Sequence, residues 1–538
     1  MKPYYVIGHK NPDCDAVVSS IAYAQLKNKL GIPAKAYALS DPNPETKYLL
    51  QKFSFPLPPI VHSAKCTLAD IEKDEAVLVS PGTTIKDALD LVITHKNKGV
   101  FITDEDKHLL GLVSVSDLTQ FWKKDEKEMA DLMRTVSIAN ILHVLKGKAW
   151  YETDFQPSGQ IHIVPSTSDD PSLIKDSIII LRNSPELQRF SIINHAAVII
   201  VCGEDWIDNV TLEMAQKEGV SIMHSSLSVL ECSRLIFECP DVSQVATRQV
   251  ICFYENETVE EVSDRLAKTR FRTYPVLNED KQVVAAISRY HLFHYEKKRF
   301  ILMDHNEAAQ SVNDLSAGIV SEIVDHHRMG GITTINPIAI TSRPVGSTCT
   351  IVASLYEQNN VELDQRTAGL LLGGLVNDTL CLRSPTTTQE DRDLAGKLEG
   401  ISGVSKEDLN VEMINAADSI LKKTDLELLY DDFKEFHIHD IKVGIGQSPC
   451  KDSADFFKIR DHFYEYLQEQ VIQQHFDLIL IMFTDPKGSG SYFLYTGKKS
   501  SAVEDGFHDI LREDGFAPGI ISRKKQVLPV IIEMLSRA

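Results

Sequence analysis

Histidine and aspartate residues directly follow an apolar run near the start of this chain. His9, Asp13 and Asp15 stand in "GHKNPDCD", immediately after "YYVIG". Asn, Pro and Asp favour turns and Asp favours helix N-caps, so the segment by itself fits a turn before a capped helix as well as a metal site. Cys14, between the two aspartates, is predicted to turn towards the core, because an extended backbone sends neighbouring side chains to opposite sides.

Three further apolar runs end in residues of the same kinds. Asp304 follows "RFILM", Asp325, His326 and His327 follow "SEIV", and Asp378 follows "LLGGLVN". We interpret each run as a strand. Because ligands bind beyond the carboxyl ends of strands in open α/β sheets, the sequence predicts that these groups meet at one edge of a sheet.

The combined set is mostly carboxylate, with imidazole and without thiolate. Such donors suit Mn²⁺, Co²⁺ or Mg²⁺ better than a structural zinc ion. The set is too large for one ion that keeps a position open for water, whereas two ions about 3.5–4 Å apart could share a carboxylate and activate water for attack on phosphorus. Taken singly, His9 could be a buried hydrogen-bonded histidine, Asp304 a turn residue, and Asp325 either a ligand or a group that orients an imidazole.

The elements that must position this set belong to an α/β domain with a block inserted in it. Residues 1–64 predict a strand, a loop, a helix ("VVSSIAYAQLKNKLG") and a second strand ("AKAYAL"). Apolar runs of the same style return after residue 300, so residues 298–410 are predicted to complete the domain. A Lys-, Glu- and Asp-rich helical stretch then leads to a last domain at 415–538.

The inserted block contains an internal repeat. Residues 83–121 match residues 257–295 in pattern without gaps, and Ser114 aligns with Ser288. Each copy predicts a β-α-β-β-α unit. The unit resembles the CBS domain, which pairs with its copy to bind adenine nucleotides.

Three parts of the inserted block follow from this repeat. The CBS-like copies are predicted at 65–125 and 246–297. Residues 126–245 predict a separate α/β domain, with strands in "DSIIIL" and "AAVIIVCG" and a helix in "VTLEMAQKEGV". Because it lies between the two CBS-like copies, we expect it to resemble the DRTGG domain, which can separate paired CBS units.

The composition restricts the partners and the compartment. A net charge of −20 argues against a nucleic-acid or anionic-membrane surface, which requires an excess of Lys and Arg. The apolar runs fall well short of the roughly 18 residues that a membrane span needs, and we see no secretory leader. Nine cysteines without a CxxC pair predict buried thiols in a reducing compartment. We therefore expect a cytoplasmic protein.

Several motifs resemble one known superfamily. "GHKNPDCD", "MDHNE", "DHHR" and "NDTLCLRSPTTT" resemble the DHH phosphoesterases and, among them, the family II inorganic pyrophosphatases. The tail "ISRKKQVLP" resembles the DHHA2 type of C-terminal domain. The resemblance covers essentially the whole chain and implies a parallel-sheet DHH domain, interrupted by the CBS/DRTGG module and followed by a smaller α/β DHHA2-type domain.

The resemblance also implies a site and a reaction, the hydrolysis of pyrophosphate to two phosphates. Asp304 would bridge two ions, and His327 would face the leaving phosphate. Lys434, Arg523 and Lys524 would bind phosphate oxygens from the C-terminal domain, which would close onto the metal-binding domain. The implied metal ligands are His9, Asp13, Asp15, Asp304, His326 and Asp378.

The repeat implies a regulatory nucleotide site. In the first copy, "GLVSVSDL" offers Ser114 and Asp117 to a ribose, whereas the second copy has His291 in place of the aspartate. Tyr274 is equally compatible with base stacking and with core packing. The ligand would be AMP, ADP, ATP or a diadenosine polyphosphate, with AMP or ADP as inhibitors, and the protein a homodimer. The predicted nucleotide residues are Val100, Ser114, Ser116, Asp117, Arg272, Thr273 and Tyr274.

Two alternatives remain open at this point. The chain could be another DHH phosphoesterase that cleaves oligonucleotides, cyclic dinucleotides or polyphosphate, although its tail has "KGSGSYF" and "SRKKQ" rather than a "GGGH"-like segment. It could also be a non-catalytic adenylate sensor on a degenerate hydrolase, against which the intact ligand set argues.

Overall fold

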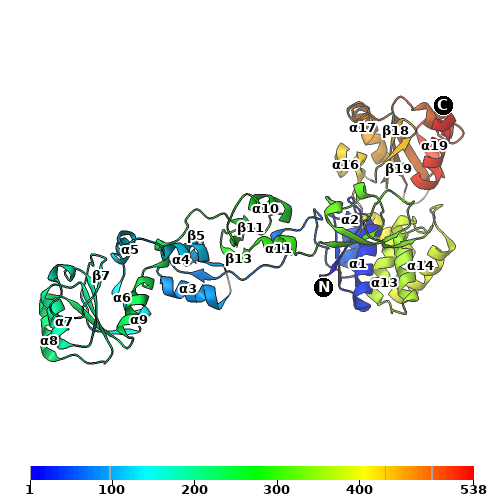
Figure 1. Ribbon diagram of the computed structural model, residues 1–538. Coiled ribbons are helices and arrows are strands. Elements are labelled where there is room, and N and C mark those ends of the chain that lie inside the picture. The colour runs from blue at the N-terminus through cyan, green and yellow to red at the C-terminus, as the bar shows by residue number, and fades with distance from the viewer. Residues whose placement is uncertain (1, 96–97, 431, 486–488, 538) are drawn as a thin grey trace. The chain divides into compact units, whose positions relative to one another are not determined.

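The chain folds into two compact units. The computed structural model describes residues 2–95, 98–430, 432–485 and 489–537. One unit combines residues 1–65 with 297–538, and the other consists of residues 66–296. The predicted fold class, an α/β domain interrupted by an inserted module and followed by a smaller α/β domain, is confirmed (Figure 1). Within the described ranges, no helix has both the length and the apolar character needed to cross a bilayer.

The first unit contains a five-stranded parallel sheet in the order β16-β15-β14-β1-β2. Val6 of β1 lies opposite Ile301 of β14. The sheet therefore joins the two halves of the domain that the inserted module separates in sequence. The strands are β1 (Tyr4–Ile7), β2 (Ala34–Tyr37), β14 (Arg299–Met303), β15 (Ile319–Asp325) and β16 (Ala339–Ser342).

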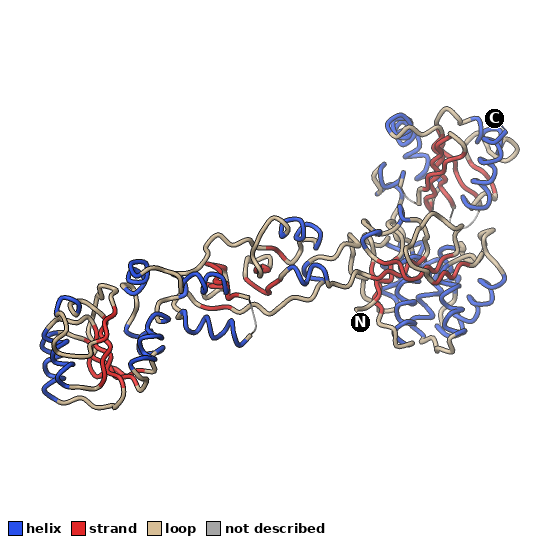
Figure 2. The backbone as a smooth tube through the Cα atoms, in the orientation of Figure 1, coloured by secondary structure: helices blue, strands red, loops and turns tan. Residues whose placement is uncertain are grey.

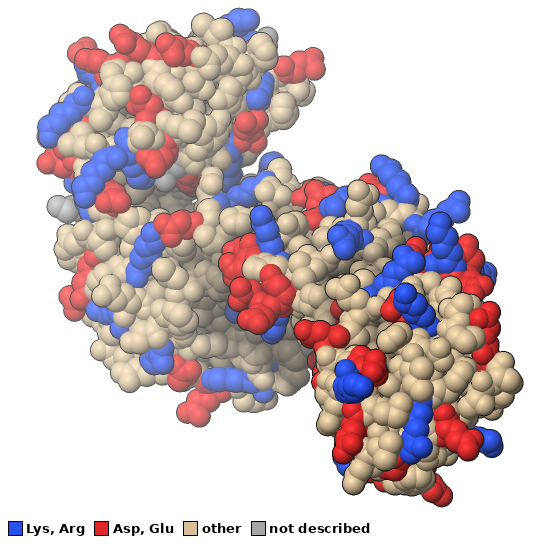
Figure 3. All heavy atoms as spheres, turned by 90° about the vertical axis from the view of Figure 1, so that its left-hand side faces the viewer, with Lys and Arg blue, Asp and Glu red and all other residues tan. Residues whose placement is uncertain are grey.

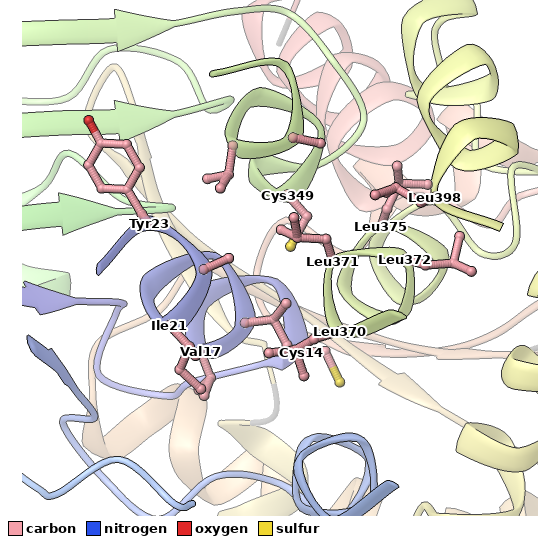
Figure 4. Close-up of a cluster of buried hydrophobic side chains, with 14 of the residues drawn as sticks. Cys14, Val17, Ile21, Tyr23, Cys349, Leu370, Leu371, Leu372, Leu375 and Leu398 are labelled. Carbon is pink, nitrogen blue, oxygen red and sulfur yellow. The ribbon is translucent and has the colours of Figure 1, made fainter. Parts of the chain in front are cut away.

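Helices pack together beside this sheet around an apolar core. In Figure 4, side chains of α1, α12 and α13 meet in this core, with Cys349 and Leu371 among them. Cys14 is fully buried there as predicted, but it begins helix α1, so the helix start rather than an extended backbone turns it inward. The helices are α1 (Cys14–Lys29), α2 (Pro44–Lys52), α12 (Thr348–Gln358), α13 (Gln365–Asp378), α14 (Gln389–Ser402) and α15 (Lys406–Ala416).

The apolar run before Asp378 is a helix, so the prediction of a strand there was wrong. Residues Gln365–Asp378 form α13, which Asp364 caps by accepting a hydrogen bond from Thr367 N at 2.9 Å. Residues 367–376 are all buried. A helix buried on all sides shows little amphipathic periodicity. Its short apolar sequence is therefore equally compatible with a buried strand.

The C-terminal part of this unit has its own mixed sheet in the order β17-β18-β19-β20-β21 (Figure 2). The pair β18 and β19 is parallel, and the other neighbours are antiparallel. The segment "RKKQV" forms a turn of π-helix at Arg523–Val527, directly before the last helix. The elements are α16 (Asp425–Leu429), β17 (Lys434–Ile438), β18 (Ile441–Pro449), α17 (Ser453–Gln473), β19 (Leu478–Thr484), β20 (Gly490–Thr496), α18 (Ser501–Phe507), β21 (Phe516–Pro518) and α19 (Leu528–Arg537).

The second unit contains the two repeat copies, each with the predicted β-α-β-β-α order. A bridge between His108 and Gln282 joins them, and Phe101 and Leu277 lie in an apolar cluster formed by both copies. The first copy comprises β3 (Leu78–Val79), α3 (Ile85–Thr94), β4 (Gly99–Thr103), β5 (Leu109–Ser114) and α4 (Val115–Phe121). The second comprises β11 (Phe253–Tyr254), α10 (Val259–Leu266), β12 (Tyr274–Leu277), β13 (Val283–Ile287) and α11 (Arg289–Phe293).

A five-stranded sheet in the order β6-β10-β9-β8-β7 forms the domain between the copies. The two runs predicted as strands are β8 and β9, and the predicted helix is α8. Lys and Arg side chains lie interspersed with Asp and Glu on the face shown in Figure 3. The elements are α5 (Glu126–Met133), α6 (Ile138–Val144), β6 (Gly147–Tyr151), β7 (Ile161–Ile163), β8 (Ile178–Arg182), α7 (Pro185–Ile193), β9 (Val198–Cys202), α8 (Asn209–Glu218), β10 (Ser221–Ser225) and α9 (Val229–Leu235).

Candidate metal centre

Strand ends, the first turn of α1, which contains Asp15, and the end of α13 bring the six predicted metal ligands together. His9 and Asp13 follow β1, Asp304 follows β14, and His326 follows β15. Asp378 is the last residue of α13 rather than the end of a strand. Asp13 also caps α1, since its Oδ1 accepts a hydrogen bond from Ala16 N at 2.9 Å, so the turn-and-cap interpretation and the site interpretation both describe this loop.

Asp304 lies between two groups of candidate ligands. Its Oδ2 is 3.5 Å from His9 Nε2, and its Oδ1 is 3.4 Å from His326 Nε2. Each group of ligand atoms lies within a 4.8 Å span. The first group is His9, Asp13 and Asp304, the second is Asp15, His326 and Asp378, and a third, overlapping group is Asp304, His326 and His327.

The backbone at Asp304 adopts a left-handed conformation, with φ at +60°. Such a conformation is uncommon for a residue other than glycine and costs about 1–3 kcal/mol, and it occurs preferentially at functional sites. Here it turns the chain sharply after β14, so that both carboxylate oxygens face histidines.

The electrostatics of the cluster favour a bound cation. Burial, together with the charge of Asp15, raises the pKa of Asp304 and the pKa of Asp378 well above the ordinary aspartate value. Burial alone would lower the pKa of His9, but Asp13 and Asp304 outweigh it and raise that pKa to about 10. Asp378 Oδ2 is buried and accepts no hydrogen bond. Several buried carboxylates with an orphaned oxygen are stabilised when metal ions supply the missing positive charge, so the donor set fits divalent cations.

Backbone and hydroxyl donors at the start of α12 hold these ligands. Asp15 accepts hydrogen bonds from Ser347 Oγ at 2.6 Å, Thr348 N at 2.6 Å and Cys349 N at 2.9 Å. Thr348 Oγ1 donates to Asp304 Oδ1 at 2.9 Å. These contacts fix the carboxylates and leave lone pairs for a metal.

The two histidines of "DHH" are held in different ways. His326 Nδ1 donates to Val345 O at 3.0 Å, which leaves Nε2 facing the carboxylates. His327 Nδ1 and His327 N contact Asp325 Oδ1 at 2.9 and 3.0 Å, and the Asn306 amide donates to Asp325 Oδ2. Despite burial, His327 holds the pKa of Asp325 well below its usual range. Of the two roles left open for Asp325, these contacts favour the one that orients an imidazole.

Two of the three predicted phosphate-binding cations reach the cluster. Lys434 Nζ lies 3.4 Å from His327 Nε2, and Lys524 Nζ donates to His326 O at 3.3 Å. Burial lowers the pKa of Lys524. Arg523 is instead paired with Asp432, whose carboxylate lies 3.0 Å from Nη2. The structure therefore does not bring Arg523 to the metal ligands.

In the first repeat copy, Ser114 and Asp117 form a capping box at the start of α4. Ser114 N and Oγ both donate to Asp117 Oδ2 at 2.7 Å. In the second copy, Ser288 N donates to His291 Nδ1 at 3.0 Å, so the imidazole takes over the capping role of the aspartate. Ser114 and Asp117 are partly exposed, and Ser116 and Arg272 are exposed.

Three of the predicted nucleotide residues have buried side chains. Tyr274 is 1 % exposed, and its hydroxyl donates to Phe271 O at 3.0 Å within the core of the second copy. These contacts favour the core-packing alternative for Tyr274, because no face of the ring is open to an adenine in this structure. The Val100 side chain is fully buried in β4, and Thr273 is buried as well.

Several residues that hold the site escaped prediction. Asn306, Ser347 and Thr348 contact the ligands or their supports, yet the sequence around Ser347 signals only the start of a helix. Their partners are distant in sequence, and only the tertiary fold brings them together.

A parallel α/β sheet that gathers carboxylates and imidazoles into two adjoining groups is suited to hold two divalent ions, as metal-dependent hydrolases do. The DHH family N-terminal domain matches residues 3–375, and the DHHA2 domain matches residues 411–534. The chain therefore belongs to the DHH family and, through a full-length relative, to the inorganic pyrophosphatases.

Three comparisons illustrate this relationship. A cobalt-dependent inorganic pyrophosphatase of Clostridium perfringens is 31 % identical over 539 residues, which cover 99 % of this chain and 98 % of the relative. A crystal structure assigned to the family II inorganic pyrophosphatases, from Methanococcus jannaschii, covers 99 % of both chains at 21 % identity and a TM-score of 0.50. The CBS and DRTGG domains of Clostridium perfringens pyrophosphatase, complexed with the activator diadenosine tetraphosphate, cover 42 % of this chain and 100 % of that chain at 24 % identity and a TM-score of 0.38.

Proposed function

We propose that this inorganic pyrophosphatase acts through two divalent ions that share Asp304, and that adenine nucleotides regulate it through the repeat copies. The observation that carries the proposal is the position of Asp304, with one carboxylate oxygen facing each ligand group. The proposed ligands are His9, Asp13, Asp15, Asp304, His326 and Asp378.

The donor set favours Mn²⁺ or Co²⁺ over Mg²⁺, because each group contains an imidazole nitrogen and Mg²⁺ prefers oxygen ligands. The name of the Clostridium perfringens relative agrees with this preference. When bound, such a pair of ions polarises phosphoryl oxygens and lowers the pKa of water.

The chain's own cations and His327 serve the substrate. Lys434 and Lys524 lie beside His327 and His326, where they neutralise the charge of pyrophosphate as it divides. Asp325 fixes the ring of His327, so that Nε2 is presented on the side of Lys434. We assign His327 a hydrogen bond to the leaving phosphate.

Arg523 remains part of the proposed substrate site, although it contacts Asp432 in this structure. Arg523 contacts Asp432 through Nη2 to its carboxylate and through Nη1 to its carbonyl oxygen, and the Asp432 carboxylate is 53 % exposed, so water competes for it. A phosphate group that offers two oxygens to the guanidinium is the stronger partner. Substrate is therefore expected to displace Asp432 from Arg523.

Regulation is assigned to the exposed end of the first copy. Asp117 uses Oδ2 for capping, and Oδ1, which accepts a hydrogen bond from Thr247 Oγ1 at 3.4 Å, retains a second lone pair for a ribose hydroxyl. Ser116 and Arg272 are exposed and can bind phosphate. We propose AMP, ADP, ATP or a diadenosine polyphosphate as the ligand, and a homodimer as the solution state.

One set of assays tests these assignments. The purified chain is supplied in turn with Mn²⁺, Co²⁺ and Mg²⁺, and phosphate release is measured from pyrophosphate, tripolyphosphate and a dinucleotide, with and without each adenine nucleotide. We expect fastest release from pyrophosphate with Mn²⁺ or Co²⁺, and a rate that changes with nucleotide. Faster cleavage of the dinucleotide would refute the substrate assignment. AMP binding without any phosphate release would favour the non-catalytic sensor.

A further inference from the structure

One short segment contacts ligands of both proposed metal sites. Residues 345–349, which we call the support segment, lead into α12. They donate to Asp15 and Asp304 and accept from His326 through Val345 O. A displacement of the support segment would therefore disturb both sites together.

Asp391 holds the support segment from the neighbouring helix α14. Its side chain is fully buried. Asp391 Oδ2 accepts a hydrogen bond from Gly346 N at 2.8 Å, and Oδ1 accepts one from Thr350 Oγ1 at 2.6 Å. Gly346 lies in the support segment, and Thr350 lies directly after it in the first turn of α12.

Helix capping accounts for only part of this arrangement. Asp391 Oδ2 also accepts from Thr388 N at 2.6 Å and from Thr388 Oγ1 at 2.7 Å, which completes a capping box on α14. A capping box needs only Thr388 and Asp391. The contacts with Gly346 and Thr350 are additional, and they cross from one helix to another.

The contact with Gly346 depends on the absence of a side chain there. A Cβ at this position would lie 2.8 Å from Asp391 Oδ2 and 2.7 Å from Thr379 Cγ2. Thr379 directly follows the proposed ligand Asp378. Only glycine at position 346 leaves room for the Asp391 carboxylate to accept a hydrogen bond from Gly346 N while Thr379 packs on the other side.

We propose that Asp391 is a positioning residue of the metal centre, which fixes the support segment and through it Asp15, Asp304 and His326. This inference rests on the proposed metal ligands. Without the carboxylate, the Gly346 N–H and the Thr350 hydroxyl lose their acceptor in a buried place, and the support segment must move to satisfy them. Partners that hold metal ligands typically contribute roughly 10–100-fold to metal affinity.

The test measures metal affinity rather than activity. Mn²⁺ binding to the metal-free full-length chain is followed by calorimetry, and the thermal midpoint is measured in EDTA. Asp391→Ala is expected to weaken Mn²⁺ binding about tenfold or more. Asp391→Asn should stay within about threefold of wild type, because its amide oxygen can replace Oδ2 and its amide N–H can donate to the Thr350 hydroxyl. Gly346→Ala, with Asp391 intact, should weaken binding as Asp391→Ala does.

Thr388→Val is the matched control. It removes one capping hydrogen bond from Asp391 but leaves the contacts with Gly346 and Thr350, so it should lower the thermal midpoint and keep Mn²⁺ affinity within about threefold. Unchanged affinity in Asp391→Ala and Gly346→Ala would overturn the positioning role, as would an equal loss in Thr388→Val. A wild-type chain that binds no Mn²⁺ would instead refute the metal centre itself.

Discussion

Replacement of Asp304 by asparagine should abolish pyrophosphate hydrolysis and, in the metal-free chain, raise the free energy of unfolding. The side chain is 2 % exposed and lies between the two ligand groups. Burial and the charge of Asp15 raise its pKa well above the ordinary value, so the ionised form is unfavourable without a cation. Asparagine keeps the shape, removes the charge and tolerates the left-handed backbone, where φ is +60°.

The two effects have different sizes. A carboxyl group whose pKa is raised in the folded state destabilises that state above its ordinary pKa, by about 1.4 kcal/mol for each tenfold change in proton affinity. Because the variant also loses the attraction between Asp304 and His9, we expect a net gain of about 1–2 kcal/mol at pH 7, or about 2–4 °C in Tm. Loss of a shared anionic ligand costs several kcal/mol of transition-state stabilisation, which is about 10³-fold or more in kcat.

Two measurements on one preparation check both effects. Phosphate release is assayed with saturating Mn²⁺, and thermal unfolding is followed in EDTA and in Mn²⁺. Mn²⁺ should raise the Tm of the wild type much more than that of Asp304→Asn. Wild-type turnover in the variant would refute the bridging role. If the Tm of Asp304→Asn in EDTA were several degrees below that of the wild type, the ionised Asp304 carboxylate would not destabilise the metal-free fold.

Three further predictions concern other parts of the chain. In EDTA, protonated His9 should stabilise the fold below its ordinary pKa of 6.5, and this contribution should be lost as pH rises through about 10. The Tm of the wild type should therefore decline over this pH range, and the Tm of His9→Gln should not. An unchanged decline in the variant would exclude His9 as its source. Lys434→Met should lower kcat/KM for pyrophosphate about 10²–10³-fold and leave Mn²⁺ affinity intact in calorimetry; near-normal kcat/KM would remove Lys434 from the substrate site. Asp117→Ala should weaken AMP binding, measured by calorimetry, about tenfold or more. Asp125→Ala, which removes an exposed helix cap in the same unit, should leave AMP binding unchanged. Equal AMP affinities in the two variants would place the nucleotide elsewhere.

Local sequence patterns predicted most of the secondary structure that carries the site. The run before Asp304 and the run before Asp325 are β14 and β15, as their alternation with polar loop residues indicated. The run before Asp378 belongs to a helix that is apolar on every side, and nothing local distinguishes such a helix from a buried strand. The ligand still arrives at the same place, because α13 ends where the strands end.

The candidate ligands could be gathered from sequence because their residue types are unusual after apolar runs. The residues that hold them could not. Asp391 reads as an ordinary helix-capping aspartate, and only the fold shows that it also contacts Gly346. The pairing of Arg523 with Asp432 and the burial of Tyr274 likewise depend on tertiary neighbours that no local pattern encodes.

Anomalous diffraction from crystals grown with Mn²⁺ tests the central claim most directly. We predict two peaks about 3.5–4 Å apart, with a carboxylate oxygen of Asp304 bound to each. His9 and Asp13 should complete one site, and Asp15, His326 and Asp378 the other. A single peak, or two peaks that do not share Asp304, would contradict the bridged two-metal centre.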